Sequence, residues 1–92
     1  MTPEKIIAVA RMYRERFERE GIPKERMDPK AFFDSTEEML AHAHYLADTT
    51  EEHARNPETY GKANRHLASL QTLLWTAEWY TLDDLMNHNR PG

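Results

Sequence analysis

Apolar residues in this chain recur at the three-and-four spacing that puts side chains on one face of an α-helix. They do so in three long segments, residues 3–20, 36–54 and 57–80, and a short acidic segment at 82–88 extends the pattern. No segment shows the alternation of a β-strand. Because short connections favour antiparallel neighbouring helices, we predict an all-α fold, an antiparallel three-helix bundle with a short C-terminal helix.

Each predicted helix begins at a capping signal. These signals are Thr2-Pro3, Ser35 with Glu38, Asn56-Pro57, and Thr81 with Asp83 and Asp84. Side-chain oxygens at such positions accept from the unpaired N–H groups of the first helical turn, and proline there lacks an N–H that would need a partner. Gly21 and Pro23 end the first helix.

The segment between the first two helices, residues 21–35, is predicted to be an ordered connector. It holds structure-breaking residues but also Ile22, Met27, Phe32 and Phe33, which need cover. With 92 residues the chain supports a single hydrophobic core, so residues 1–92 are expected to form one helical domain.

Composition narrows the function classes. The chain has no cysteine, which excludes disulfides and thiolate metal sites. Residues 31–60 hold seven Asp/Glu against one Lys/Arg, which argues against a broad nucleic-acid surface. No apolar stretch is long enough for a membrane span, and the first residues do not resemble a secretory signal. The expectation is a cytoplasmic protein that contacts no membrane.

The stretch HAHYLADTTEEH, residues 42–53, holds three histidines and three acids, which are residue types that ligate metal ions. On a helix, however, His42 and His44 point about 200° apart, and His42 and His53 lie about 16 Å apart. His44, Asp48 and Glu51 remain as a solvent-facing row, the weak candidates for a metal. Because a divalent site needs ligands from other elements as well, we predict no metal site.

The helix at 57–80 carries a second stripe on the side opposite its main apolar face. Small residues at Gly61 and Ala68 would allow another helix to approach, and Trp75 and Trp79 offer the amphipathic area enriched at interfaces. With Phe32 and Phe33 as further anchors, the stripe favours a protein partner or self-association as a homo-oligomer. The alternative is that helix 3–20 or the connector covers the tryptophans within one molecule.

A different class of function is a small-ligand or nucleotide site between helices or subunits. His66 lies inside the main apolar stripe of helix 57–80, and the polar lining would be His66, Arg65, Lys62 and Tyr60. No catalytic set or cofactor motif is present, so the sequence favours a protein that is not an enzyme. A metal-dependent helical hydrolase stays a remote alternative, because Ala41 stands where the acidic signature of all-α nucleotide pyrophosphohydrolases has its third acid.

The segment KANRHLASLQTLLWTAEWYTLDDLMNHNRP, residues 62–91, resembles the C-terminal end of small uncharacterised helical proteins of bacteriophages and bacteria. The resemblance covers about a third of the chain and carries no assigned activity. It implies a phage or prophage setting. Taken with the aromatic stripe, it leads us to expect a small non-enzymatic binding module, a phage-type accessory protein engaging a host factor.

Overall fold

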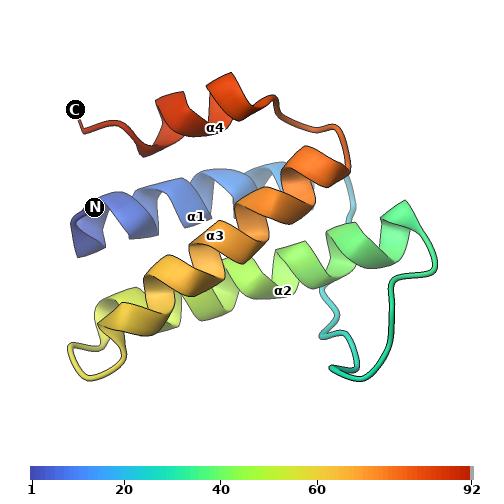
Figure 1. Ribbon diagram of the computed structural model, residues 1–92, viewed down its shortest axis with the longest axis horizontal. Coiled ribbons are helices and arrows are strands. Elements are labelled where there is room, and N and C mark those ends of the chain that lie inside the picture. The colour runs from blue at the N-terminus through green and yellow to red at the C-terminus, as the bar shows by residue number, and fades with distance from the viewer. Residues whose placement is uncertain (92) are drawn as a thin grey trace.

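The chain forms an all-helical structure. The computed structural model describes residues 1–91, and the helices in that range are α1 (Pro3–Arg19), α2 (Thr36–Arg55), α3 (Tyr60–Thr76) and α4 (Leu82–Asn89). Figure 1 shows α1 and α2 running in opposite directions, α3 turning back across α2, and α4 lying above α1. No strand occurs in residues 1–91, which confirms the predicted all-α class. None of these helices is long and apolar enough to cross a membrane.

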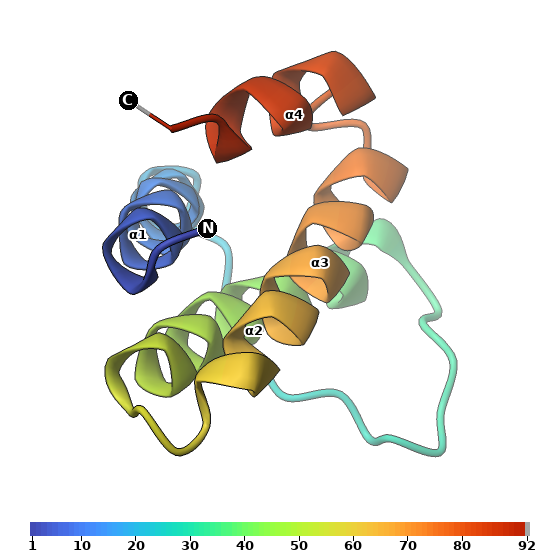
Figure 2. The same ribbon diagram turned by 60° about the vertical axis from the view of Figure 1, so that its left-hand side comes forward.

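The central element is α2. It packs along both α1 and α3, whereas α1 meets α3 and α4 over shorter stretches. Figure 2 shows α3 crossing α2 obliquely and α4 running from the end of α3 back over α1. The antiparallel three-helix bundle is a finer description than this arrangement supports, and it stays a prediction.

The predicted capping signals act at three of the four helix starts. Thr2 accepts from the N–H of Lys5, and Ser35 accepts from the N–H of Glu38. Thr81 and Asp84 form a reciprocal capping box. As a result α1, α2 and α4 begin where the sequence predicts, and each ends within one residue of the predicted position.

Helix α3 is shorter at both ends than the predicted 57–80. At its start, Asn56 does not cap a helix: its side chain accepts from Glu58 N–H and its carbonyl from Thr59 N–H, which makes residues 56–59 a turn. The helix therefore begins at Tyr60.

At the other end of α3, Glu78 adopts a left-handed backbone with φ of 62°. The N–H of Trp79 bonds to the carbonyl of Leu74 and that of Glu78 to the carbonyl of Trp75, the hydrogen-bond pair of a Schellman ending. Trp79 and Tyr80 thus belong to a corner and not to the helix.

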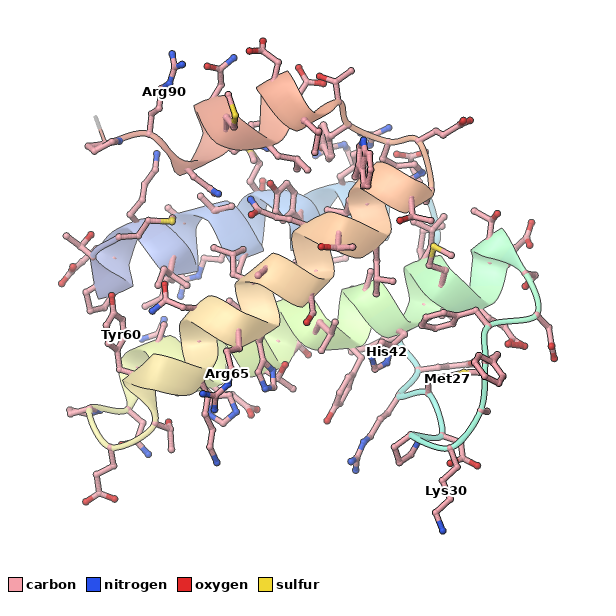
Figure 3. The ribbon with its side chains drawn as sticks, in the orientation of Figure 1. Met27, Lys30, His42, Tyr60, Arg65 and Arg90 are labelled. Atoms are coloured by element: carbon pink, nitrogen blue, oxygen red, sulfur yellow. The ribbon has the colours of Figure 1, made fainter. Side chains whose placement is uncertain are left out.

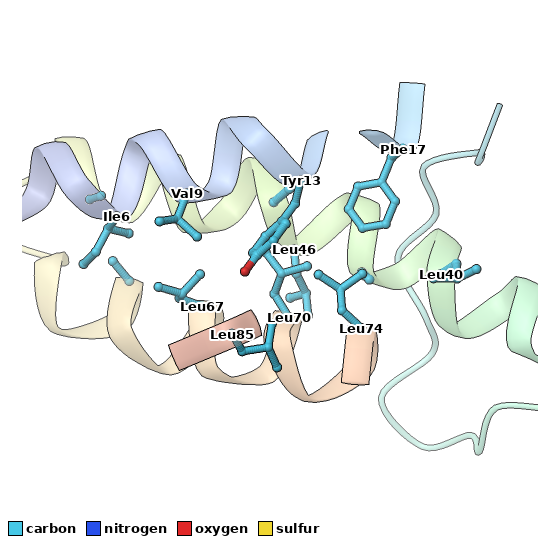
Figure 4. Close-up of a cluster of buried hydrophobic side chains, with 14 residues drawn as sticks. Ile6, Val9, Tyr13, Phe17, Leu40, Leu46, Leu67, Leu70, Leu74 and Leu85 are labelled. Carbon is cyan, nitrogen blue, oxygen red and sulfur yellow. The ribbon is translucent and has the colours of Figure 1, made fainter. Parts of the chain in front are cut away.

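The core fills the space between the four helices (Figure 4). Its largest fully buried apolar side chains are Ile6, Tyr13 and Phe17 from α1 and Leu70 and Leu74 from α3. From α2 come small residues such as Ala43 and Ala47, which are fully buried. Small side chains on α2 let two neighbours pack closely against it, in keeping with its central position.

Helix α4 is fastened to the rest by a polar clasp. The buried hydroxyl of Tyr13 accepts from Gln71 Nε2 at 3.0 Å and lies 2.7 Å from His88 Nδ1. Gln71 and Asn89 exchange two further hydrogen bonds, at 2.8 and 3.0 Å. With the Gln71 amide donating to the Tyr13 oxygen, His88 Nδ1 is the acceptor next to the hydroxyl proton, and we assign His88 as a neutral ring that accepts from Tyr13.

Candidate functional sites

The corner between α3 and α4 is an open groove of about 660 Å³. Trp75 lines it from the last turn of α3 with 48% of its surface exposed, and Leu82 lines it from the first turn of α4 with 56% exposed. Met86, one turn further along α4, is exposed as well. Large apolar side chains at this exposure form a surface suited to contact with another molecule.

Trp79, the second predicted anchor, is partly covered. Its ring packs 5.2 Å from that of Phe17, and the Arg16 guanidinium lies 4.2 Å from its centroid. Arg16 in turn bonds Glu20 at 2.6 Å. Intramolecular cover, the alternative considered from the sequence, therefore applies to part of Trp79, while Trp75 keeps a half-exposed face.

The rim of this corner is acidic. Glu78, Asp83 and Asp84 line the groove, and no Lys or Arg does. The backbone N–H of Thr81 bonds Asp84, and this bond, with that of the Thr81 hydroxyl, holds the pKa of Asp84 below its ordinary value. The corner thus combines apolar surface with negative charge.

The aromatic anchors from the connector lie elsewhere. The connector runs on the opposite side of α2 from α4 (Figures 1 and 2). Phe32 is 90% exposed there, whereas Phe33 is half-buried against His42, with ring centroids 5.8 Å apart. Gly61 and Ala68 are exposed on α3, so the predicted stripe does face outward, but the connector anchors belong to a separate surface.

A second concave site, which we call the connector pocket, has a volume of about 340 Å³. It lies between the connector, α2 and α3, and its lining includes Arg26, Phe33, His42, Tyr45 and His66. Figure 3 shows His42 pointing from α2 toward the connector at Met27. Sequence reasoning missed this site because neither His42 nor Arg26 carries a motif.

The hydrogen bonds of His42 and His66 define which ring nitrogen carries the proton. His42 Nδ1 accepts from the Met27 N–H at 3.1 Å, which leaves the proton on Nε2. The Thr49 hydroxyl lies 3.1 Å from the Leu46 carbonyl and 2.7 Å from His66 Nδ1. We assign the hydroxyl proton to the carbonyl, which can only accept, and His66 Nδ1 as the donor to Thr49. His66 Nε2 is then an unprotonated acceptor.

Positive charge surrounds both histidines. Burial, then Arg26, lowers the pKa of His42 below 6.5. For His66, burial comes first, followed by His53, Arg65, Lys62 and His42, all of which lower its pKa. Neither Arg26, Lys62 nor Arg65 takes part in an ion pair within the described part of the chain.

The predicted ligand set His66, Arg65, Lys62 and Tyr60 does not line one site. Lys62 and Arg65 lie close enough to His66 to lower its pKa, but of the four only His66 lines the connector pocket. The Tyr60 hydroxyl donates to the Met1 carbonyl beside α1, whereas Arg65 points away from the core on the other side of α3 (Figure 3). Tyr60 instead lines a separate groove with Pro3 and Ile7. Tyr60 and Arg65 are about 1.4 helical turns apart along α3, which places their side chains on different faces of the helix.

The predicted solvent-facing row of His44, Asp48 and Glu51 is wrong for His44. Its side chain is 5% exposed, stacks on Phe17 at 5.0 Å, and donates from Nδ1 to the Ile22 carbonyl at 2.9 Å. The connector folding back over α2 causes this burial. Among residues 1–91 no three His, Asp or Glu side chains come close enough together to hold a metal ion.

Asp48 and Glu51 are occupied by cations from α1, the connector and α2. Glu51, with a side chain 13% exposed, accepts from Arg11 Nε and Nη2 at 3.0–3.1 Å and also pairs with Arg14 and Arg55. The Arg11 hydrogen bond is the main reason that the pKa of Glu51 falls from 4.5 to about 2. Asp48 pairs with Lys24 at 2.6 Å and Arg14 at 3.4 Å. This cluster fastens α1 to α2.

The chain matches no known protein-family model, and no curated protein and no solved structure is significantly similar to it.

Proposed function

We propose that this protein is a small non-enzymatic binding module whose α3–α4 corner takes a partner protein segment. The observation that carries the proposal is Trp75, which stands 48% exposed on an ordered helix beside the exposed Leu82. Tryptophan is one of the residue types enriched among the side chains that contribute most of the binding energy at protein interfaces.

The chemistry of the corner specifies the partner. Three carboxylates and no cation line the groove, so an apolar side chain flanked by Lys or Arg fits it, and an acidic segment does not. In the three-helix bundle that we propose as the scaffold, the corner sits at one end, where a partner can approach without meeting the connector. A phage-type accessory role that engages a host factor agrees with such a module and is part of the proposal.

The test is selection from a random peptide library with the wild-type protein as bait, counter-selected against Trp75→Ser. We expect an enriched pattern of apolar and basic residues whose peptides bind wild type and bind Trp75→Ala at least about thirtyfold more weakly, the loss typical of a hot-spot tryptophan. Met12→Ala, which changes an exposed apolar residue of α1, is the matched control and keeps wild-type affinity.

Two results would overturn the proposal. Enriched peptides without basic residues, or with equal affinity for Trp75→Ala, would show that the corner is not the site. Light scattering that finds a dimer dispersed by Trp75→Ala would assign the corner to a second copy of the chain.

A further inference from the structure

The connector pocket is a candidate binding site that is independent of the α3–α4 corner. His42 and His66 both line the pocket, and Nδ1 of each ring is held by Met27 or Thr49. The nitrogens left for a ligand are His42 Nε2–H, a donor, and His66 Nε2, assigned above as an acceptor. Two histidines with opposite hydrogen-bonding roles in one concavity are complementary to a ligand group that both accepts and donates.

The electrostatic surroundings limit the charge of that group. Arg26 lines the pocket, and Lys62 and Arg65 lie near His66 on α3. The acid in the lining is Asp28, which accepts from the Lys30 N–H at 2.9 Å and thereby closes a turn of the connector. Within the lining, Arg26 and Asp28 balance in charge, and Lys62 and Arg65 add positive charge beside His66. On a protein with a net charge of −4, such local positive charge favours an anion.

A phosphate monoester meets both requirements, and a carboxylate meets one. A phosphate group carries several acceptor oxygens and, with its second pKa near 6, shares a proton with an acceptor at neutral pH. A carboxylate is an acceptor alone at that pH and leaves His66 Nε2 without a donor. The aromatic rings of Phe33 and Tyr45, each 5.8 Å from that of His42, form apolar walls for a planar group.

We propose that the connector pocket binds an aromatic or nucleoside phosphate monoester, with His42 Nε2–H and Arg26 donating to phosphate oxygens and His66 Nε2 sharing the phosphate proton. No bond is made or broken in this step. The ester group lies against Phe33 and Tyr45. A volume of about 340 Å³ accommodates a single ring with its phosphate.

The test follows the ¹⁵N signals of the histidine side chains by NMR while phenyl phosphate is titrated into the protein. We expect saturable shifts of His42 and His66, and at least about tenfold weaker binding by Arg26→Gln, which loses a charge-assisted hydrogen bond. His66→Asn keeps a donor for Thr49 and removes the Nε2 acceptor, and His42→Asn keeps an acceptor for Met27 and removes the Nε2 donor. Each is also expected to bind at least about tenfold more weakly.

Two controls separate the site from general attraction of anions. Arg90→Gln removes a cation at the C-terminal end, away from the connector, and is expected to keep wild-type affinity (Figure 3). Phenylacetate, which has the same ring with a carboxylate, is expected to bind at least about tenfold more weakly than phenyl phosphate. AMP and a phosphotyrosine peptide as competitors distinguish a free nucleotide from a modified protein as the source.

The pH dependence of phenyl phosphate binding provides a further test. The titratable or charged groups around the two rings are Arg26 and Asp28 from the connector, Tyr45 and His53 from α2, and Lys62 and Arg65 from α3. Since the bound phosphate must keep the proton that it shares with His66 Nε2, and its second pKa is near 6, binding is expected to be tighter at pH 6.5 than at pH 8. Equal affinity for phenylacetate, no change on Arg26→Gln, or no shift of either histidine at saturating phenyl phosphate would each overturn the proposal.

Discussion

Glu78 holds at the end of α3 the same left-handed backbone conformation that Gly21 holds at the end of α1. Both helices end in the same pair of hydrogen bonds, with Ile22 N–H on the Phe17 carbonyl in one and Trp79 N–H on the Leu74 carbonyl in the other. Glycine adopts this conformation without steric cost, whereas a residue with a Cβ does not. Glu78 therefore carries backbone strain beside the proposed binding corner.

Replacing Glu78 with glycine is expected to raise the free energy of unfolding by about 1 kcal/mol, because the strain is removed. Denaturant unfolding measures the change. The reciprocal variant, Gly21→Ala, has open space for its Cβ and is expected to lose about 1 kcal/mol for conformational reasons alone. A destabilised Glu78→Gly protein would contradict the assignment of strain.

Removing the hydroxyl of Tyr13 is expected to loosen α4. In Tyr13→Phe, Gln71 Nε2 and His88 Nδ1 lose a shared partner, which costs about 1–3 kcal/mol. Relative to wild type, amide hydrogen exchange in Tyr13→Phe is expected to become faster in α4 and to change less in α2. Tyr45→Phe, whose hydroxyl makes no hydrogen bond within the described residues, is the control, and equal exchange in both variants would show that the clasp does not hold α4.

Loss of the Glu51 carboxylate is expected to weaken the attachment of α1 to α2. Glu51→Gln breaks charge-assisted bonds to Arg11 and Arg55 and is expected to lower the free energy of unfolding by about 1–2 kcal/mol. Glu18→Gln is the matched control, since that side chain is well exposed and its pair with Arg14 spans 4.0 Å. A control as unstable as Glu51→Gln would contradict the role of the network.

Stability is expected to rise with pH across two windows. Burial is the leading cause of the lowered folded-state pKa of His42, His66 and His88, so the unfolded chain binds more protons below 6.5 and stability falls as pH drops through that value. Glu51 adds a second loss between pH 4.5 and about 2. Urea unfolding at successive pH values checks the sign, and stability that increases as pH falls from 7 to 5 would be the opposite result.

The helix faces were predictable because each apolar face follows the helical period and each start but that of α3 has a side-chain cap. The end of α3 was not, because Glu78 takes a position where the sequence signal is glycine. The burial of His44 was also hidden, since it depends on the connector folding over α2.

The candidate sites divide in the same way. The outward face of α3 with Trp75 follows from spacing along one helix, and sequence reasoning found it. The connector pocket joins Arg26, His42 and His66, three residues that are far apart along the chain and that meet through tertiary contacts alone. No periodicity or motif reports such a meeting.

The central claim is that the acidic, apolar α3–α4 corner binds a basic, apolar partner segment. The most direct measurement is the affinity of a selected peptide for Asp83→Lys, determined by calorimetry beside wild type. Because the substitution reverses a charge on the rim and leaves Trp75 in place, we predict binding at least about tenfold weaker, with the difference shrinking at high salt. Unchanged affinity for Asp83→Lys would contradict the claim.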